Sequence, residues 1–513
     1  MRVATVQGMA VTIGSRSGIT LELFERVAWR GEGVRVAAEA LRRADATRAA
    51  FLRLLDRPGV VVYGVTSGYG DRAAVRLGPE ERRRHAATAA HRDASFGAPL
   101  PERVARGIVL ARLANLLDGH AAVSGRLLEA VAAMLDPAAG PLPAVPLQGN
   151  GGSGEILALG HLFAPLLERG DLGEKEGLAL INGSPCAAAL AADAALAARA
   201  RLALAYEIFT LSAEAFRAPL DAYDPALEAL WGDQHETRAL RRLRALLGME
   251  PHRGEGVAAD AAPGDRRPYQ APVSYRILPR VLGQAERALD AAEHAASVSL
   301  RAVSDNPVYL PPAPDAPDPA HPDGRVLSTG GYHNALAPAA LHGLAVSWAE
   351  LCQLAERHVE HLTFTVSPPA TRQDGGELLL HLLLMVAVGY AEEARAAAQP
   401  VLLPRAGPGQ NDVTAPSFLA WSRQEAAAAS LEAALAVLGA AATHWLAQSQ
   451  RPLPPTLAEL VAETRQYFPP LVERRPIGPD VARLAEHLRS RVFGDASRGT
   501  SITRRSGSPR PGR

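Results

Sequence analysis

One short loop surrounds a single serine with glycines, a composition found in loops that bind phosphate or need unusual backbone geometry. The sequence LQGNGGSGEILALGHL runs from Leu147 to Leu162, and Gly149, Gly151 and Gly154 satisfy the G-x-G-x-x-G pattern of dinucleotide-binding proteins. That pattern requires a buried strand before the loop. The preceding segment PLPAVPLQ contains prolines, which cannot donate hydrogen bonds to a central sheet ladder. The loop therefore does not predict a dinucleotide site, and its glycines need another explanation.

Further loops combine glycine or proline with tyrosine, asparagine, glutamine or arginine, which are side chains that bind or activate small substrates. Each loop alone has an ordinary structural interpretation, such as a core tyrosine, a turn asparagine or a surface arginine, and short motifs often occur by chance. Their joint presence is more informative, because binding and catalytic residues concentrate on loops held by rigid elements. These loops are YGVTSGYG (63–70), INGSPC (181–186), YQAPVSYRILPRVLG (269–283), SDNPV (304–308), STGGYH (328–333) and GQNDV (409–413).

Long helical stretches are predicted to hold these loops. Ser184 and Pro185 form a helix start, with serine at the N-cap and proline at the first helical position. Helices of the predicted lengths exceed the mean of about twelve residues, and they predict a mostly α protein built on a bundle of long helices. The predicted ranges are 186–218, 284–303, 338–366 and 417–448.

The chain divides into three parts by composition. Residues 1–220 form an N-terminal region that contains the tyrosine loop and the glycine loop, and residues 221–496 contain a central long-helix bundle and C-terminal helices. Residues 497–513 are basic and rich in serine and glycine, which predicts a disordered tail.

Charge and composition exclude several classes of protein. The formal net charge is zero, which argues against binding to nucleic acid or to a membrane surface. Lys175 is the only lysine, and its segment GDLGEKEG indicates a solvated residue, not the Schiff-base lysine of a pyridoxal-phosphate enzyme. Cys186 and Cys352 lie in apolar helical runs and are expected to be reduced core residues. The first residues lack the apolar stretch of a signal peptide, so we expect a soluble cytoplasmic protein.

A metal site is a weaker hypothesis. His358 and His361, in HVEH, lie at positions i and i+3 of a predicted helix. Without a third ligand nearby, this pair is expected to be solvated or at the edge of the core, and no metal is predicted.

Together and in this order, the seven loops resemble those of the aromatic amino acid lyase family, which includes the histidine, phenylalanine and tyrosine ammonia-lyases and related aminomutases. The resemblance covers about residues 12 to 490. It implies a homotetramer with a fumarase/aspartase-like central bundle and active sites built from loops of more than one subunit. It also implies a prosthetic group made from the backbone, 4-methylidene-imidazole-5-one (MIO), and no external cofactor.

The family forms MIO from an Ala-Ser-Gly tripeptide, and the matching tripeptide here is Gly152-Ser153-Gly154. Cyclisation requires the amide nitrogen of residue 154 to attack the carbonyl carbon of residue 152. An ordinary backbone resists this approach sterically, whereas glycine relaxes the limits on φ and ψ. Ser153 then loses its hydroxyl group to leave an exocyclic methylene. This reaction is the favoured explanation for the glycines.

The resemblance also assigns roles in the other loops. Tyr63 matches the tyrosine that removes the substrate's β-proton. Asn182 matches the asparagine that contacts substrate and prosthetic group, beside a helix N-terminus that favours developing negative charge. Arg276 matches the arginine that holds the substrate carboxylate, for which its planar fork is suited. Gln270 and Tyr332 match further positions of the substrate pocket.

Several positions depart from the family pattern. Glu155 stands where the family has an aspartate after the tripeptide, which keeps the charge but lengthens the side chain, and Gly152 replaces the usual alanine. Val273 stands where the family has a lid tyrosine. Tyr275 and Tyr269 are the alternatives for that tyrosine's place.

Two positions bear on the substrate's ring. His91-Arg92 falls where the family has its ring-selecting pair, and His91 resembles the tyrosine-specific members, because an imidazole can hydrogen-bond a phenol. Asn411 falls where histidine lyases have glutamate, and its neutral amide disfavours histidine. Arg92, larger and more polar than the usual leucine, would shrink the pocket, point away or pair with Asp93. The alternative is that His91 is an ordinary helix residue. Tyrosine is the favoured substrate and phenylalanine the next.

Three functions remain open from the sequence. The first is an ammonia-lyase that converts an aromatic L-amino acid into an aryl acrylate. The second is a 2,3-aminomutase, which uses the same group and returns the amine to the β-carbon. The third is a decayed lyase that serves as a non-catalytic scaffold. Val273 favours the scaffold, whereas Tyr63, Ser153, Asn182 and Arg276 oppose it.

Overall fold

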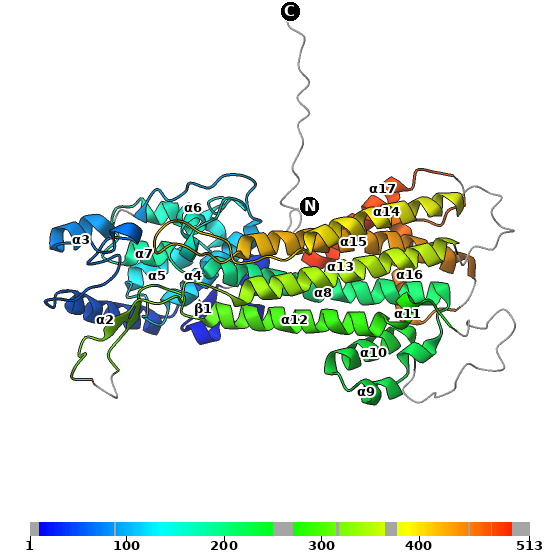
Figure 1. Ribbon diagram of the computed structural model, residues 1–513, viewed down its shortest axis with the longest axis horizontal. Coiled ribbons are helices and arrows are strands. Elements are labelled where there is room, and N and C mark those ends of the chain that lie inside the picture. The colour runs from blue at the N-terminus through cyan, green and yellow to red at the C-terminus, as the bar shows by residue number, and fades with distance from the viewer. Residues whose placement is uncertain are drawn as a thin grey trace, which may run out of the picture.

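The computed structural model describes residues 10–86, 89–249, 270–313, 318–364, 377–449, 452–472 and 474–494. These residues form an elongated, mostly helical chain, with a bundle of long helices towards one end and a lobe of shorter helices and loops at the other (Figure 1). The predicted disordered tail and Tyr269 lie outside the described residues.

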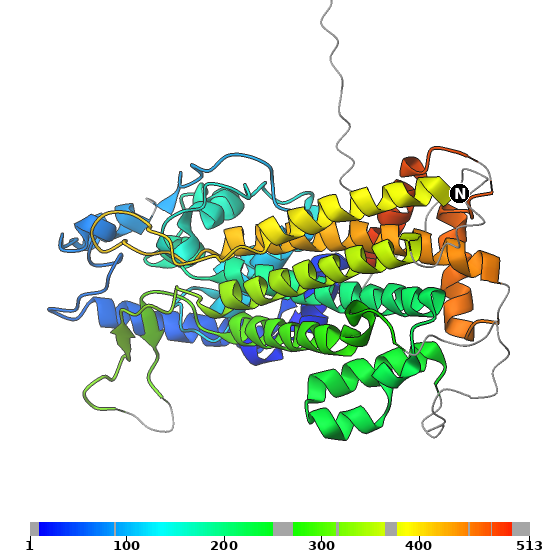
Figure 2. The same cartoon turned by 45° about the vertical axis from the view of Figure 1, so that its right-hand side comes forward.

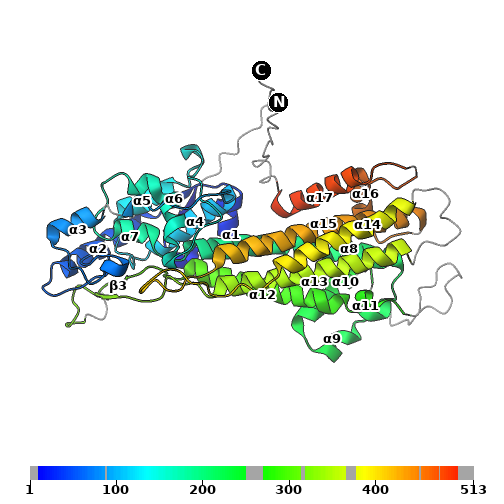
Figure 3. The same cartoon turned by 45° about the horizontal axis from the view of Figure 1, so that its top comes forward.

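The bundle consists of long helices that run side by side in every view (Figures 1 to 3). Four of them confirm the predicted helices, with ends that differ by a few residues. The additional member, α14, was not predicted. The bundle helices are α8 (Pro185–Phe216), α12 (Leu278–Arg301), α13 (Leu336–Phe364), α14 (Glu377–Ala397) and α15 (Ser417–Ser449).

The bundle helices pack closely because small residues lie where two helices meet. At Gly439 of α15, a Cβ atom would lie 3.2 Å from the Cδ1 atom of Ile208 on α8. Residues 176–216 and helix α15 are long and apolar enough to cross a membrane, yet their most apolar windows are 100% and 83% buried within the chain. Packing inside the bundle explains their composition. Cys186 and Cys352 are free and buried, as predicted.

A lobe of shorter helices and strands surrounds the N-terminal end of α8. Strand β1 (Val11–Ile13) pairs in parallel with β2 (Val34–Val36), and β3 (Val308–Leu310) pairs antiparallel with β4 (Arg325–Leu327). Helix α4 packs directly on α8 and links the lobe to the bundle. The lobe helices are α1 (Leu21–Phe24), α2 (Ala38–Leu55), α3 (Pro79–Ala86), α4 (Glu102–Leu116), α5 (Gly125–Ala133), α6 (Ile156–Leu167) and α7 (Glu176–Ile181).

The remaining helices lie along the bundle, and the last residue of α17, Phe493, reaches the lobe and packs against Trp29 (Figures 1 and 3). They are α9 (Ala226–Trp231), α10 (Gln234–Leu247), α11 (Val273–Arg276), α16 (Pro455–Tyr467) and α17 (Gly478–Phe493). Helix α8, which the sequence assigned to the N-terminal region, packs against α12, α13 and α15 of the bundle. The boundary at residue 220 stays a prediction.

The expectation that Lys175 is solvated is wrong. Its side chain is 0% exposed and forms a salt bridge with Asp305, whose side chain is also 0% exposed. Burial lowers the pKa of the Lys175 ammonium group, and the Asp305 carboxylate opposes that shift. The pair joins the start of α7 to the SDNPV loop, which lies 130 residues away in the sequence. The segment GDLGEKEG contains polar residues and glycine because it makes a turn, and the lysine inside it points into the protein.

Breaking this pair should destabilise the protein strongly. Lys175→Met removes the ammonium group and leaves the Asp305 carboxylate buried without its counter-ion, which typically costs about 3 to 5 kcal/mol. We expect a lower urea midpoint, measured by circular dichroism. The double variant Lys175→Met/Asp305→Asn, which also removes the buried negative charge, should recover part of the loss. An unchanged midpoint in the single variant would show that the pair does not stabilise the fold.

Candidate active site

A cavity of about 490 Å³ brings together residues from six of the seven predicted loops. Tyr63, Ser153, Asn182, Tyr332 and Asn411 all line it, although they are spread over most of the sequence. The structure therefore places a candidate base, the candidate MIO serine and three amide or phenol side chains around one space. The lining residues are Tyr63, Tyr69, Gly70, Arg92, Ser153, Ile156, Leu178, Ile181, Asn182, Asn306, Ser328, Thr329, Gly330, Tyr332, Gln410 and Asn411.

The tripeptide Gly152-Ser153-Gly154 adopts a conformation that requires glycine on both sides of the serine. Gly152 has φ +93° and Gly154 has φ +77°, in a region that other residues rarely occupy. At Gly154, a Cβ atom would also lie 2.4 Å from the Oδ1 atom of Asn182. At Gly152 there is room for a Cβ atom, so its backbone angle is the constraint there. The loop thus fits the group that the family forms from this tripeptide.

Asn182 is fixed from two sides. Its side-chain Nδ2 atom donates a hydrogen bond to the backbone carbonyl oxygen of Asn306 at 3.1 Å. Its backbone carbonyl oxygen accepts a hydrogen bond from the guanidinium group of Arg112 at 2.9 Å. The next residue, Gly183, donates from its amide nitrogen to the carbonyl oxygen of Gly154 at 3.1 Å. These bonds position the Asn182 amide against the tripeptide, as its predicted role requires.

The GQNDV loop holds the tripeptide from the other side. The Oδ1 atom of Asn411 accepts a hydrogen bond from the amide nitrogen of Ser153 at 3.0 Å and another from the Ser153 hydroxyl. The Thr414 hydroxyl donates to the carbonyl oxygen of Gly152 at 2.6 Å. Asn411 was predicted to contact the substrate's ring. In this structure its amide contacts the reactive serine.

Tyr63 lies in a loop whose backbone supports its hydroxyl group. The phenol oxygen accepts a hydrogen bond from the amide nitrogen of Gly70 at 2.9 Å. A donor aimed at this oxygen stabilises negative charge there, which a tyrosine base needs. Gln410 donates to the carbonyl oxygen of Gly70 and so connects this loop to the GQNDV loop.

Glu155 links the tripeptide to the start of α8. Its carboxylate accepts hydrogen bonds from the amide nitrogens of Cys186 at 2.6 Å and Ala187 at 2.8 Å, the first free N–H groups of that helix. Ser184 occupies the N-cap position, as predicted, but its side chain makes no capping hydrogen bond. Burial raises the pKa of Glu155 to about 7, against the lowering effect of these N–H donors and of Arg112. The longer side chain thus caps a helix that begins 30 residues later.

His91 does not line the cavity. Its side chain is exposed, on a loop residue with φ +60°, and the neighbouring Arg92 lines the cavity instead. The prediction that His91 contacts the substrate's ring therefore finds no support in the geometry, and neither does its alternative as a helix residue.

Gln270 and Arg276 lie far from the cavity in this chain. Arg276 ends α11, towards the opposite end of the molecule from α6 and α7 (Figure 1). Gln270 is exposed, and the Nε atom of Arg276 donates to the carbonyl oxygen of Ala271 at 3.0 Å. A single copy therefore does not bring the predicted carboxylate clamp to the predicted base and serine.

Tyr275 cannot replace the missing lid tyrosine. Its side chain is buried between the rings of Phe216 and His358, with ring centroids 4.5 Å and 3.8 Å away. Val273 is 56% exposed. His358 is buried and its Nδ1 atom lies 3.1 Å from the Ser212 hydroxyl. The expectation that the histidine pair is solvated or at the edge of the core is wrong for His358, and among the described residues no group of three or more potential metal ligands is found.

Sequence reasoning missed Arg112, Thr414 and the role of Lys175. The signal for Arg112 was available, because this arginine interrupts the apolar run from Ile108 to Leu117. A buried cation in such a run requires a polar partner. Nothing in the sequence marks Thr414 as a contact of the tripeptide.

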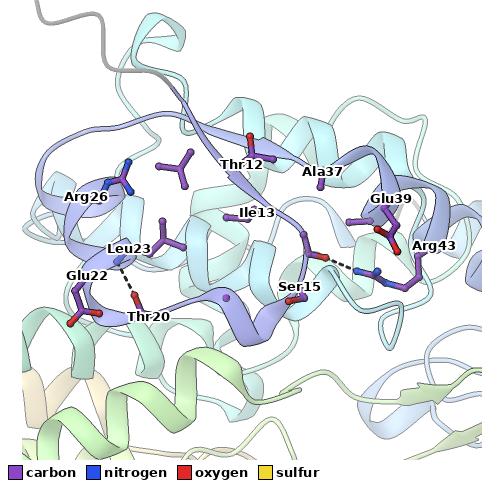
Figure 4. Close-up of a pocket in the computed structure, with 14 residues that line it drawn as sticks. Thr12, Ile13, Ser15, Thr20, Glu22, Leu23, Arg26, Ala37, Glu39 and Arg43 are labelled. Carbon is purple, nitrogen blue, oxygen red and sulfur yellow. Dashed lines mark hydrogen bonds between the residues drawn. The ribbon is translucent and has the colours of Figure 1, made fainter.

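A second cavity, of about 570 Å³, lies at the N-terminal strands (Figure 4). Its arginines already have partners: Arg26 forms a salt bridge with Glu32 at 2.7 Å, and Arg43 donates to the carbonyl oxygen of Gly14 at 2.6 Å. None of the motifs contributes to this cavity, which makes the first cavity the candidate active site.

Comparisons with known proteins agree with the fold and identify the family. The family described as "Aromatic amino acid lyase" matches residues 19–173 and 167–466. The chain is 30% identical over 507 residues to histidine ammonia-lyase of Symbiobacterium thermophilum, which covers 91% of this chain and 95% of the relative. Phenylalanine aminomutase of Pantoea agglomerans has a TM-score of 0.82 at 18% identity and covers 94% and 100% of the two chains. Tyrosine aminomutase of Streptomyces globisporus has a TM-score of 0.78 at 23% identity, with 95% and 98% covered.

The long-helix bundle and the family match place the chain among the carbon–nitrogen lyases. The chain belongs to the aromatic amino acid lyase family. The predicted family and the predicted fold class are confirmed.

Replacing Glu155 should change how stability depends on pH. Between pH 4.5 and about 7 the unfolded chain loses the Glu155 proton while the folded chain keeps it, so rising pH lowers the free energy of unfolding in this window. One proton corresponds to about 1.4 kcal/mol per pH unit. Glu155→Gln should remove this component, measured as urea midpoints from pH 5 to 8. Glu129→Gln, on the exposed face of α5, is the control. A Glu155→Gln variant with the wild-type pH dependence would contradict the assignment.

Proposed function

We propose that this protein is an MIO-dependent ammonia-lyase that eliminates ammonia from an aromatic L-amino acid to give the aryl acrylate. The observation that carries the proposal is the tripeptide Gly152-Ser153-Gly154, whose backbone angles and contacts suit cyclisation, in a cavity with Tyr63 and Asn182. MIO, once formed, supplies an electrophile for the substrate's amine. Membership of a family that depends on this group supports its formation here.

The residues of this chain have separable tasks in the proposed reaction. Tyr63, as the phenolate, takes the β-proton and becomes a neutral phenol, and the Gly70 amide stabilises the negative charge on the phenolate oxygen before this transfer. Asn411 and Thr414 hold the tripeptide in position through the Ser153 amide and the Gly152 carbonyl. Asn182 presents its amide to the same space. The convergence of these groups on one cavity favours an enzyme over a decayed scaffold.

Completion of the site requires a second copy of the chain. Arg276 is suited to binding a carboxylate, yet α11 lies far from Ser153 within one chain (Figure 1). In a symmetric oligomer, α11 of one copy can reach the cavity of another. We therefore propose a homotetramer in which Gln270 and Arg276 of a neighbouring copy hold the substrate's carboxylate.

The proposed substrate class is an aromatic amino acid. The tyrosine preference rested on His91, whose exposed position gives it no support, and Arg92 is the residue of the predicted pair that lines the cavity. The same machinery would serve a 2,3-aminomutase, so every assay of this protein should quantify both the aryl acrylate and the β-amino acid.

Mass spectrometry tests the prosthetic group directly. Cyclisation and dehydration of the tripeptide remove two water molecules, so the peptide that contains Ser153 should be lighter by about 36 Da than its sequence predicts. Ser153→Ala should abolish the loss of mass and turnover together. An unmodified peptide from freshly purified, folded wild-type protein would contradict the proposed function and favour the scaffold.

Complementation between two impaired variants, assayed at a substrate concentration where each alone has little turnover, tests the shared site. Tyr63→Phe removes the proposed base and should lower kcat by about 100-fold or more. Arg276→Ala removes the carboxylate clamp and should chiefly raise KM. Mixed oligomers contain some cavities with a wild-type Tyr63 and a wild-type Arg276 from a neighbour, so co-expression should restore part of the turnover.

The control is co-expression of two differently tagged copies of the Tyr63→Phe variant, which should stay inactive. If mixed oligomers form, as shown by tandem affinity purification, and no turnover returns, Arg276 does not act across subunits.

A further inference from the structure

The candidate active site contains an arginine whose charge is not balanced within the chain. Arg92 is partly buried and lines the cavity with Tyr63 and Ser153. Across the described ranges its guanidinium group forms no hydrogen bond or salt bridge, not even with the adjacent Asp93. Arg112 also lies close to the tripeptide, but it donates to the backbone carbonyl oxygen of Asn182 and does not line the cavity. An unpaired guanidinium at a cavity wall is available to a ligand.

The cavity supplies no counter-ion for this arginine. Among the described residues that line it, Arg92 is the only one with a charged side chain, and none is an aspartate or a glutamate. His85, which stacks on the cavity residue Tyr69 with ring centroids 4.2 Å apart, is not a second cation, because burial lowers the pKa of its imidazole and the charges of Arg72 and Arg92 lower it further. The cavity therefore carries one positive charge that an anionic ligand can neutralise.

Arg92 lies beside an apolar part of the cavity wall. Its backbone packs against Gly160 of α6, where a Cβ atom would lie 2.7 Å from the Cβ atom of Arg92. The first residue of the same helix, Ile156, lines the cavity together with Leu178 and Ile181 of α7. Apolar side chains of this kind accommodate an aromatic ring. A charged group beside them can bind a substituent on that ring and so provide specificity.

We propose that Arg92 selects an aromatic amino acid whose side chain ends in a planar anionic acceptor, such as a ring carboxylate. This inference rests on the proposed function, in which Arg276 of a neighbouring copy binds the α-carboxylate and leaves Arg92 for the side chain. The guanidinium fork can donate two parallel hydrogen bonds to a carboxylate, whereas a neutral phenol offers one oxygen atom. A phenyl ring would leave the guanidinium without a partner, and a site of this kind rejects such analogues.

The test compares 4-carboxy-L-phenylalanine with L-phenylalanine and L-tyrosine in the full-length protein. The wild type should show the highest kcat/KM for the carboxylated substrate. In Arg92→Met, which keeps an unbranched side-chain stem but removes the guanidinium group, the ratio of kcat/KM for the carboxylated substrate to that for phenylalanine should fall by about 10- to 100-fold. Arg92→Lys keeps the positive charge but lacks the planar fork. Its ratio of kcat/KM values should therefore lie between those of the wild type and Arg92→Met. Arg83→Met, on the exposed face of α3, is the matched control.

Two results would overturn the inference. The first is a wild type that prefers phenylalanine or tyrosine. The second is an Arg92→Met variant that loses the same factor for all three substrates, because that result would place Arg92 on the shared α-carboxylate or give it a structural role.

A binding measurement separates this inference from the proposed function. In the Ser153→Ala variant, which cannot cyclise, calorimetry should show tighter binding of 4-carboxycinnamate than of cinnamate, and Arg92→Met in the same background should remove the difference. Equal affinities would overturn the role of Arg92. If wild-type protein lacks the loss of mass at Ser153 but retains this difference in binding, the proposed reaction fails and the anion-selective cavity stands.

Discussion

The contact between Gly154 and the Asn182–Gly183 segment is the constraint on which the candidate site depends. The carbonyl oxygen of Gly154 accepts a hydrogen bond from Gly183, and the space for a Cβ atom at residue 154 is already taken by the Asn182 amide. This close approach places the tripeptide directly against the junction of α7 and α8. The other contacts of the site hold the tripeptide or this junction in place.

Two ionisable groups support the junction, the partly exposed Glu155 and the fully buried Arg112. Glu155 caps the first turn of α8, and Arg112 donates to the carbonyl oxygen of Asn182. Burying either group costs free energy unless hydrogen bonds replace the lost water, and the helix N-terminus provides such bonds for the carboxylate. The exchange of the family's aspartate for a glutamate is therefore compatible with the same task, because the longer side chain still reaches two adjacent N–H groups.

The sequence predicted the bundle well because long apolar runs without glycine or proline have few alternatives to a buried helix. It also predicted the cavity residues Tyr63, Ser153, Asn182, Tyr332 and Asn411, because their loops have unusual compositions in a fixed order. The orientation of His91 and Arg92 could not be predicted. His91 has φ +60° and is exposed, whereas the adjacent Arg92 lines the cavity, and no local sequence pattern encodes that difference.

Interactions across long sequence separations were also beyond prediction. Lys175 lies among polar residues and glycines, which is typical of a surface turn, and its partner Asp305 belongs to a distant loop. Arg276 was recognised from its motif, yet a motif does not show whether a residue completes the site of its own chain or that of another. That information lies in the distance between α11 and the tripeptide (Figure 1).

The burial of Lys175 determines which reagents can react with the folded protein. Because this residue is the only lysine and its ammonium group is enclosed, the folded chain offers no lysine side chain to acylating reagents or to a lysine-specific protease. Reaction at residue 175 therefore requires the segment between α6 and α7 to open. The rate of such labelling therefore reports the opening of this segment, without a new residue having to be introduced.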